Sequence, residues 1–104
     1  MDLKKKKYKN FKLIEGDILD TLSPFLKKKK KICLLHLDLD VYEATKYVLK
    51  NLFPLIVKNG IILIDDYGHI DNTTKAIDEF LKENKKLKIS KFTFPARPSY
   101  IVKK

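Results

Sequence analysis

The chain of 104 residues is poor in several residue types, and each shortage excludes a class of protein. Its single cysteine, Cys33, cannot form a disulfide within the chain, and the apolar run around it predicts a buried, reduced thiol. No apolar run approaches the roughly 20 residues that span a bilayer. No apolar segment follows the charged N-terminus, as one would in a secretory signal. We therefore expect a cytoplasmic protein with no membrane segment.

Negative charge is also scarce, because 13 acidic residues accompany 23 basic ones and the formal net charge is +10. Lysine runs at residues 4–7 and 27–31 would suit a nucleic acid or an anionic membrane. Arg97 is the only arginine, however, and proteins that read nucleic acids usually use arginine forks with interleaved aromatic residues. We expect a solvated lysine surface with no specific nucleic-acid partner. A non-catalytic basic binding module stays open as an alternative.

Hydrophobic periodicity predicts a single α/β domain. The run Ile32–Leu37 is apolar apart from His36, which predicts a parallel strand buried on both faces with His36 packed inside it. A helical pattern starts at Tyr42, and a second apolar strand follows at residues 61–64, after an Asn-Gly pair ends the helix. Strand, helix and strand together predict a right-handed βαβ unit.

The flanking segments predict the remaining elements. These are a strand at residues 10–15, a short helix capped by Asp20 or Ser23, a helix from Asp71 or Asn72 to about Glu83, and strands at residues 86–94 and 99–103. The short proline-bounded connection between the last two strands cannot hold a crossover helix. We therefore expect these two strands to pair antiparallel.

Four aspartates in two doublets are the strongest functional signal. Asp38 and Asp40 follow the first apolar strand, and Asp65 and Asp66 follow the second. Because carboxyl ends of neighbouring parallel strands meet at one edge, we expect all four where open α/β sheets bind ligands. Clustered carboxylates repel unless a cation or a shared proton intervenes, and oxygen ligands suit Mg²⁺ better than zinc. Helix capping and turn formation are the structural alternatives.

Several motifs occur in a characteristic order around these aspartates. They are Glu15-Gly-Asp17, Leu35-His-Leu-Asp-Leu-Asp-Val-Tyr42, Asn59-Gly-Ile-Ile-Leu-Ile-Asp-Asp-Tyr-Gly68 and the tail Ala96-Arg-Pro-Ser-Tyr100. In this order and strand context they resemble the macrocin O-methyltransferase family, metal-dependent sugar O-methyltransferases that use S-adenosylmethionine. The resemblance implies an α/β fold equal to the C-terminal part of a Rossmann-like class I methyltransferase sheet, with parallel strands, helical crossovers and a final antiparallel strand pair.

The resemblance also implies roles for the aspartates. Asp38, Asp65 and Asp66 would bind Mg²⁺, and Asp40 would serve as the general base. A metal near a sugar hydroxyl lowers its pKa, and a neighbouring carboxylate can take the proton. The expected partner is therefore a small hydroxyl acceptor, a sugar or a polyketide-linked sugar.

The cofactor site is only partly represented. Gly16, Asp17 and Ile18 match the place where such enzymes line the adenine pocket, and a plain strand-ending turn is the alternative. The family also has a glycine-rich turn for the methionine part of the cofactor and a strand ending in an acid for the ribose. Neither is here, and the only other glycines are Gly60 and Gly68. Residues 1–104 therefore resemble one partial methyltransferase domain that lacks the N-terminal glycine-rich half.

This departure has a structural consequence. Without two central strands, Ile32–Leu37 would leave an exposed apolar edge, and residues 10–15 would have no neighbour. We expect one of three outcomes: the first strand slides next to Ile32–Leu37, a partner chain or a second copy covers the edge, or the fold is marginal. On its own, the chain is expected to be a truncated or inactive fragment that binds S-adenosylmethionine weakly or not at all.

A second enzyme class would use the same aspartates. In a haloacid-dehalogenase-type phosphatase, Asp38 and Asp40 would be nucleophile and acid, and the second doublet would hold Mg²⁺. That motif carries Thr or Val two residues after its second aspartate, where this chain has Tyr42. Turnover of a generic aryl phosphate would distinguish this alternative.

Overall fold

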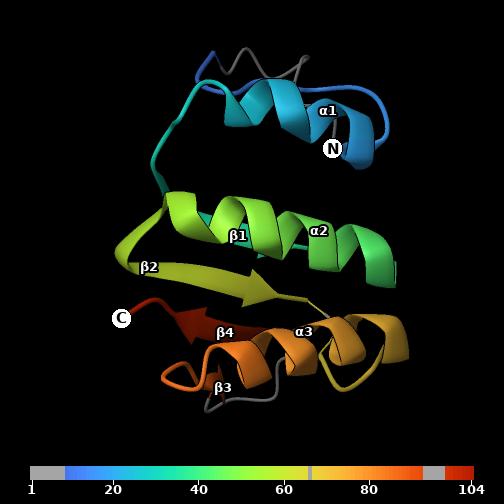
Figure 1. The fold of residues 1–104 in the computed structure, drawn as a ribbon, viewed down its shortest axis with the longest axis vertical. Helices are drawn as coiled ribbons and strands as arrows, with labels where there is room; N and C mark the ends of the chain where they lie inside the picture. The colour runs from blue at the N-terminus through green and yellow to red at the C-terminus, as the bar shows by residue number, and fades with distance from the viewer. Residues whose placement is uncertain (1–8, 66, 93–97) are drawn as a thin grey trace.

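The computed structural model describes residues 9–65, 67–92 and 98–104 and shows helices on one face of a small sheet (Figure 1). In chain order the elements are α1 (Ile18–Leu26), β1 (Ile32–Leu37), α2 (Tyr42–Leu52), the 3₁₀ turn η2 (Phe53–Leu55), β2 (Ile56–Ile64), α3 (Asp71–Glu83), β3 (Ile89–Lys91) and β4 (Ser99–Val102). The expected α/β class is confirmed. Asp66, Arg97, the first lysine run and the end of the strand expected at residues 86–94 lie outside the described residues.

The four strands form one mixed sheet in the order β1-β2-β4-β3. β1 and β2 are parallel and joined through α2, which confirms the βαβ unit. β4 pairs antiparallel with both β2 and β3, which confirms the antiparallel pair expected at the end of the chain. Leu37 is the register partner of Ile64, so β1 and β2 end at the same level.

The hydrophobic core lies between the sheet and helices α2 and α3, which cover the same face (Figure 1). Its fully buried side chains come from β2, β4 and the inner faces of α2 and α3, and they include Ile62, Ile64, Ile77 and Ile101, which are 0% exposed. The helix expected to reach about Glu83 is confirmed as α3, and its Ile77 and the neighbouring Ala76 are buried in this core. No helix in the described part of the chain is long and apolar enough to cross a membrane.

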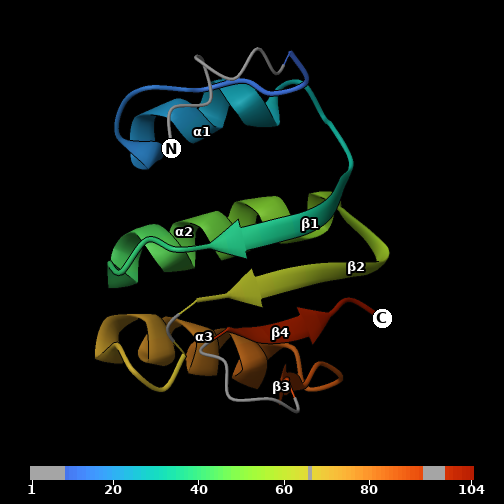
Figure 2. The ribbon, with the colours of Figure 1, turned by 180° about the vertical axis from the view of Figure 1, so that it is seen from behind.

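The opposite face of the sheet carries no helix of the described chain, as Figure 2 shows from behind. The expectation that Ile32–Leu37 is buried on both faces is therefore wrong. Leu34 is 56% exposed, and both Cys33 and His36 are exposed instead of packed inside. The exposure of β1 has two causes: the described helices cover a single face of the sheet, and β1 is its edge strand.

The strand expected at residues 10–15 does not form, and this segment does not pair with β1. Leu13 and Ile14 are 57% and 51% exposed. Apolar residues alone do not make a strand, because the backbone needs a neighbouring ladder to satisfy its polar groups. The segment instead leads into α1, which begins at Ile18, earlier than the expected caps Asp20 and Ser23 imply.

β2 is longer than expected, because it starts at Ile56 and includes Asn59 and Gly60. The register with β1 shifts between the pairs Ile32↔Ile56 and Leu34↔Ile61, so β2 carries extra residues in a bulge. Asn59 has φ 68° there, a conformation that asparagine tolerates better than most residues. The Asn-Gly pair therefore shapes a bulge and does not end the helix.

Candidate functional site

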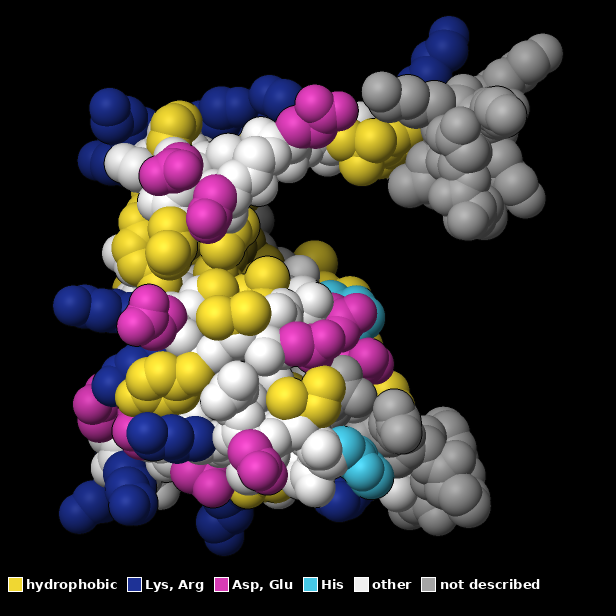
Figure 3. Space-filling model, turned by 90° about the vertical axis from the view of Figure 1, so that its right-hand side faces the viewer, with side chains coloured by type: hydrophobic (Ala, Val, Ile, Leu, Met, Phe, Trp, Pro, Cys, Tyr) yellow, Lys and Arg dark blue, Asp and Glu magenta, His cyan; other side chains and the backbone are white. Residues whose placement is uncertain are grey.

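Asp38 and Asp65 occupy neighbouring positions at the carboxyl edge of the sheet. Each directly follows the last residue of its strand, Leu37 in β1 and Ile64 in β2. The backbone N–H of Asp65 donates to the carbonyl oxygen of Leu37 at 3.2 Å, which ties the two strand ends together. Figure 3 looks onto this side and shows acidic side chains grouped beside a histidine. As expected from the sequence, Asp38 and Asp65 therefore follow the ends of two adjacent strands.

His36 contributes to this edge, although the sequence predicted a packed residue. Its Nε2 lies 4.0 Å from Oδ1 of Asp65, and the two side chains are 50% and 37% exposed. An exposed pair at that distance contributes little to stability because solvent screens it. The histidine is therefore a neighbour of the aspartate at the edge of the sheet and not a core residue.

Asp40 adopts a left-handed backbone conformation, with φ 58°. Its side chain is exposed, in the short connection between β1 and α2. The N-cap of α2 is Val41, whose side chain makes no capping hydrogen bond. The residue that stands at the N-cap is therefore neither Asp38 nor Asp40. Non-glycine residues in such conformations cost free energy and concentrate at functional sites.

The donor chemistry at this edge suits a hard cation. Asp38 and Asp65 supply only oxygen ligands, which Mg²⁺ prefers. Within residues 9–65, 67–92 and 98–104, no group of three His, Cys, Asp or Glu side chains is gathered closely enough to hold a metal. Asp66, the third expected ligand, lies outside the described residues. In the described part, two of the three expected ligand residues, Asp38 and Asp65, therefore stand at neighbouring strand ends.

Two tyrosines that follow the aspartates make hydrogen bonds to α3, which sequence reasoning missed. The Tyr42 hydroxyl donates to Oε2 of Glu79 at 2.5 Å, and the Tyr67 hydroxyl donates to Oδ1 of Asp78 at 2.6 Å. The hydrogen bond to Asp78 raises the pKa of the Tyr67 hydroxyl, with partial burial as a second cause. The sequence does show a tyrosine shortly after each aspartate doublet, Tyr42 and Tyr67. It does not show which acidic residues these tyrosines contact.

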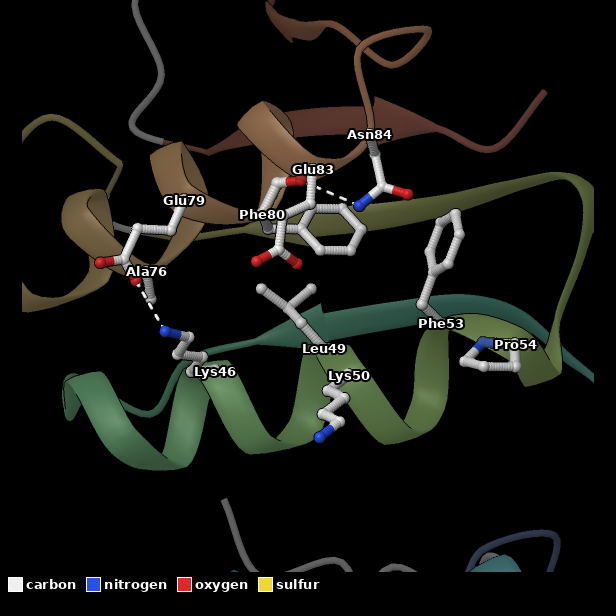
Figure 4. A pocket seen from close by; sticks show the side chains of 10 residues that line it. All are labelled: Lys46, Leu49, Lys50, Phe53, Pro54, Ala76, Glu79, Phe80, Glu83 and Asn84. Atoms are coloured by element: carbon white, nitrogen blue, oxygen red, sulfur yellow. Dashed lines mark hydrogen bonds and ion pairs between the residues drawn. The ribbon is translucent and has the colours of Figure 1, made fainter.

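A groove of about 380 Å³ lies between α2 and α3 (Figure 4). Phe53 and Phe80 form its apolar wall, with ring centroids 5.1 Å apart in an edge-to-face arrangement. At one end, Nζ of Lys46 lies 3.0 Å from Oε2 of Glu79. Hydrogen bonds from Tyr42 and Lys46 hold the pKa of the Glu79 carboxyl below its usual value. None of the expected site residues lines this groove, so it is not the candidate active site.

The three candidate cofactor residues lie at the start of α1. Gly16 has φ 123°, a conformation that favours glycine, and Asp17 is the N-cap of α1, its Oδ1 accepting from the N–H of Leu19 at 2.9 Å. Gly16 and Ile18 line a cavity of about 230 Å³ whose other walls include Leu22 and Phe25. The N-terminal ends of the helices lie on the same side of the molecule as the carboxyl ends of β1 and β2 (Figure 1).

A family model described as macrocin-O-methyltransferase (TylF) matches residues 4–91. The 8-demethyl-8-(2,3-dimethoxy-alpha-L-rhamnosyl)-tetracenomycin-C 4'-O-methyltransferase of Streptomyces olivaceus is 36% identical over 50 residues, which are 48% of this chain and 19% of that protein. The demethyldecarbamoylnovobiocin O-methyltransferase of Streptomyces niveus is 35% identical over 49 residues, which are 47% of this chain and 19% of that protein. The matched segment thus spans about a fifth of each relative.

Solved structures of methyltransferases share the fold. The apo structure of CalS11, a TDP-rhamnose 3'-O-methyltransferase in calicheamicin biosynthesis, superposes with a TM-score of 0.75 at 28% identity, over 86% of this chain and 40% of that chain. The O-methyltransferase NovP gives a TM-score of 0.63 at 25% identity, over 71% of this chain and 30% of that chain. These matches favour a methyltransferase sheet over the phosphatase and the basic-module alternatives.

Proposed function

This chain belongs to the macrocin O-methyltransferase family, and we propose that it forms the metal- and acceptor-binding part of an enzyme that methylates a sugar-like hydroxyl. The enzyme would depend on Mg²⁺ and S-adenosylmethionine. The observation that carries the proposal is the meeting of Asp38 and Asp65 at the ends of adjacent parallel strands, tied by the hydrogen bond from Asp65 to Leu37. Ligands of open α/β sheets bind at this edge.

Each aspartate has a role in this proposal. Asp38, Asp65 and Asp66 hold Mg²⁺, and Asp40 accepts the proton that the acceptor hydroxyl loses. When bound, Mg²⁺ lowers the pKa of that hydroxyl, and S-adenosylmethionine supplies the methyl group. The left-handed backbone of Asp40 supports its role, because it turns the chain sharply between the end of β1 and the start of α2. The side chain of Asp40 is exposed, at the same edge of the sheet as Asp38.

For the cofactor, we propose that Gly16, Asp17 and Ile18 border the adenine. The cavity beside Gly16 and Ile18 supports this, because its apolar walls suit one face of a flat base. The side chain of Asp17 is engaged in capping α1, so its contribution to binding would be to fix the start of that helix. These residues supply only part of a cofactor site.

We propose that polypeptide outside these 104 residues supplies the remaining contacts, with a partner chain or a second copy as the expected source. β1 is an edge strand in which Leu34 is exposed, and Ile61 of β2, its register partner, is 37% exposed on the face that carries no helix of the described chain. Covering this apolar surface would stabilise the sheet. The net charge of +10 opposes close approach of a second copy, so it favours an acidic partner.

The expected cytoplasmic location is part of the proposal. The exposed thiol of Cys33 suits a reducing compartment, where it would stay free. The acceptor class is likewise proposed: the similarity to a TDP-rhamnose 3'-O-methyltransferase supports a sugar hydroxyl, without naming the sugar.

Titration calorimetry with Mg²⁺ tests the proposal on the full chain. We expect Asp38→Asn and Asp65→Asn each to weaken binding by about tenfold or more, because each removes one charged ligand. Asp20→Asn is the matched control, since it removes an exposed carboxylate on α1 and should leave the affinity unchanged. Equal affinities in all four proteins, or no binding by the wild-type chain, would refute the metal site.

A further inference from the structure

Two segments that carry the aspartate doublets are attached to the same short stretch of α3. Tyr42, two residues after Asp40, donates to Glu79, and Tyr67, two residues after Asp65, donates to Asp78. Asp78 and Glu79 are consecutive residues, so both attachments are made within one turn of the helix. Hydrogen bonds of 2.5–2.6 Å from a hydroxyl to a carboxylate are of the charge-assisted type and are stronger than neutral ones.

Further contacts reinforce the attachment of Tyr42. Nζ of Lys46 donates to the Tyr42 hydroxyl at 3.1 Å and lies 3.0 Å from the Glu79 carboxylate. Nζ of Lys75 lies 4.7 Å from the centre of the Tyr42 ring, within cation–π range. Tyr42 is thus contacted from α2 by Lys46 and from α3 by Glu79 and Lys75.

The attachment of Tyr67 has its own support. The backbone N–H of Gly68, the next residue, donates to Oγ1 of Thr74 on α3 at 2.8 Å. Gly68 has φ 85°, and an added Cβ would meet no atom within 4 Å, so its turn is defined by backbone conformation and not by crowding. The segment after β2 is therefore held to α3 at two adjacent points.

We propose that Tyr42 and Tyr67 are positioning residues that hold the two aspartate-bearing segments against α3 and so fix their spacing at the edge of the sheet. The carboxylates of the site repel one another until a cation binds, and the backbone bond between Asp65 and Leu37 is the direct link between the strand ends. Attachment of both segments to one rigid helix prevents them from separating. The two segments are then already ordered when the chain folds, so metal binding does not have to supply the free energy of ordering them.

This inference rests on the proposed metal site, so its test has two independent arms. In the first, calorimetry with Mg²⁺ compares the wild type with Tyr42→Phe and Tyr67→Phe, at a temperature where all are folded. We expect each variant to weaken Mg²⁺ binding by about threefold to tenfold, because only part of the free energy of a lost charge-assisted hydrogen bond is transmitted to the metal site. Glu79→Ala should act like Tyr42→Phe, whereas Glu79→Gln keeps an acceptor for the hydroxyl and should restore most of the affinity.

Tyr47→Phe is the matched control. It lies on α2, packs against the same core, and its hydroxyl makes no hydrogen bond in the described part of the chain. The second arm measures amide hydrogen exchange in the metal-free chain. We expect the amide of Asp65, which is protected by Leu37, to exchange about fivefold faster in Tyr67→Phe and at the wild-type rate in Tyr47→Phe.

The outcomes separate the two claims. If the wild-type chain binds no Mg²⁺, the proposed function fails, and the exchange arm alone decides whether the tyrosines restrain the segments. If the wild type binds Mg²⁺ and the tyrosine variants bind it equally well, the positioning role is refuted while the metal site stands. Unchanged exchange at Asp65 in Tyr67→Phe would refute the attachment itself.

Discussion

Gly60 controls the register of the two strands that carry the aspartates, and Gly60→Ala should disrupt it. A Cβ built on Gly60 would lie 2.6 Å from Cγ2 of Ile56, 2.8 Å from the carbonyl oxygen of Val57 and 3.2 Å from that of Cys33. Two of these atoms are backbone, one of them in β1, so they cannot withdraw without moving the strands. The bulge sets where β2 pairs with β1, and it therefore sets where Asp65 meets Leu37.

We expect Gly60→Ala to lower the free energy of unfolding by about 3 kcal/mol, the upper part of the range for inserting a methyl group into a filled site. With a slope of about 1.5 kcal/mol/M, the midpoint of urea unfolding falls by roughly 2 M. Lys58→Ala, an exposed position in the same bulge, should change the free energy by less than about 0.5 kcal/mol. A loss below about 0.5 kcal/mol in Gly60→Ala would show that the bulge is not sterically fixed.

Three further predictions concern single residues and the cofactor. Ser99 is 0% exposed and its hydroxyl has no hydrogen-bond partner among the described residues, so Ser99→Ala should raise the free energy of unfolding by about 1 kcal/mol. A lower free energy of unfolding in urea would contradict this. Folding lowers the pKa of Glu79, so the contribution of its carboxylate to the free energy of unfolding is present above the ordinary value of 4.5 and is lost as pH falls below it. The free energy of unfolding measured from pH 6 to 3 should therefore decline less in Glu79→Gln than in the wild type. Parallel curves would refute this. Calorimetry should detect weak or no binding of S-adenosylmethionine to these 104 residues, and micromolar binding would show that they suffice to bind the cofactor.

Local sequence signals were sufficient to predict the elements whose bounds are set by residues close to them in the sequence. The bounds of β1 are those expected, because a continuous apolar run followed by Asp38 marks a buried strand end. The periodic apolar face of α3, with Ala76 and Ile77 inward, defined that helix up to Glu83. Its cap was not predicted correctly, since Ile70 stands at the N-cap and no described side chain caps the helix, so the packing of the inner face outweighs capping.

Features that depend on distant segments were not predictable. Residues 10–15 have strand-like composition but no ladder partner, and β1 looked doubly buried although the described helices cover one face. For the same reason His36 and Cys33 turned out to be exposed. At the site, the order of the doublets predicted that Asp38 and Asp65 meet, whereas the attachment of Tyr42 to Glu79 joins residues 37 positions apart and leaves no local signal.

The most direct test of the account uses Mn²⁺ in place of Mg²⁺ and records paramagnetic broadening of the backbone amide resonances of the full chain. The account predicts that broadening is strongest around Asp38 and Asp65, at the ends of β1 and β2, and that Asp38→Asn abolishes it there. Amides of the acidic first turn of α1, near Asp20, should stay sharp at the same Mn²⁺ concentration. Broadening spread over all exposed acids, or centred on α1 or α3, would contradict a metal site at the carboxyl edge of the sheet.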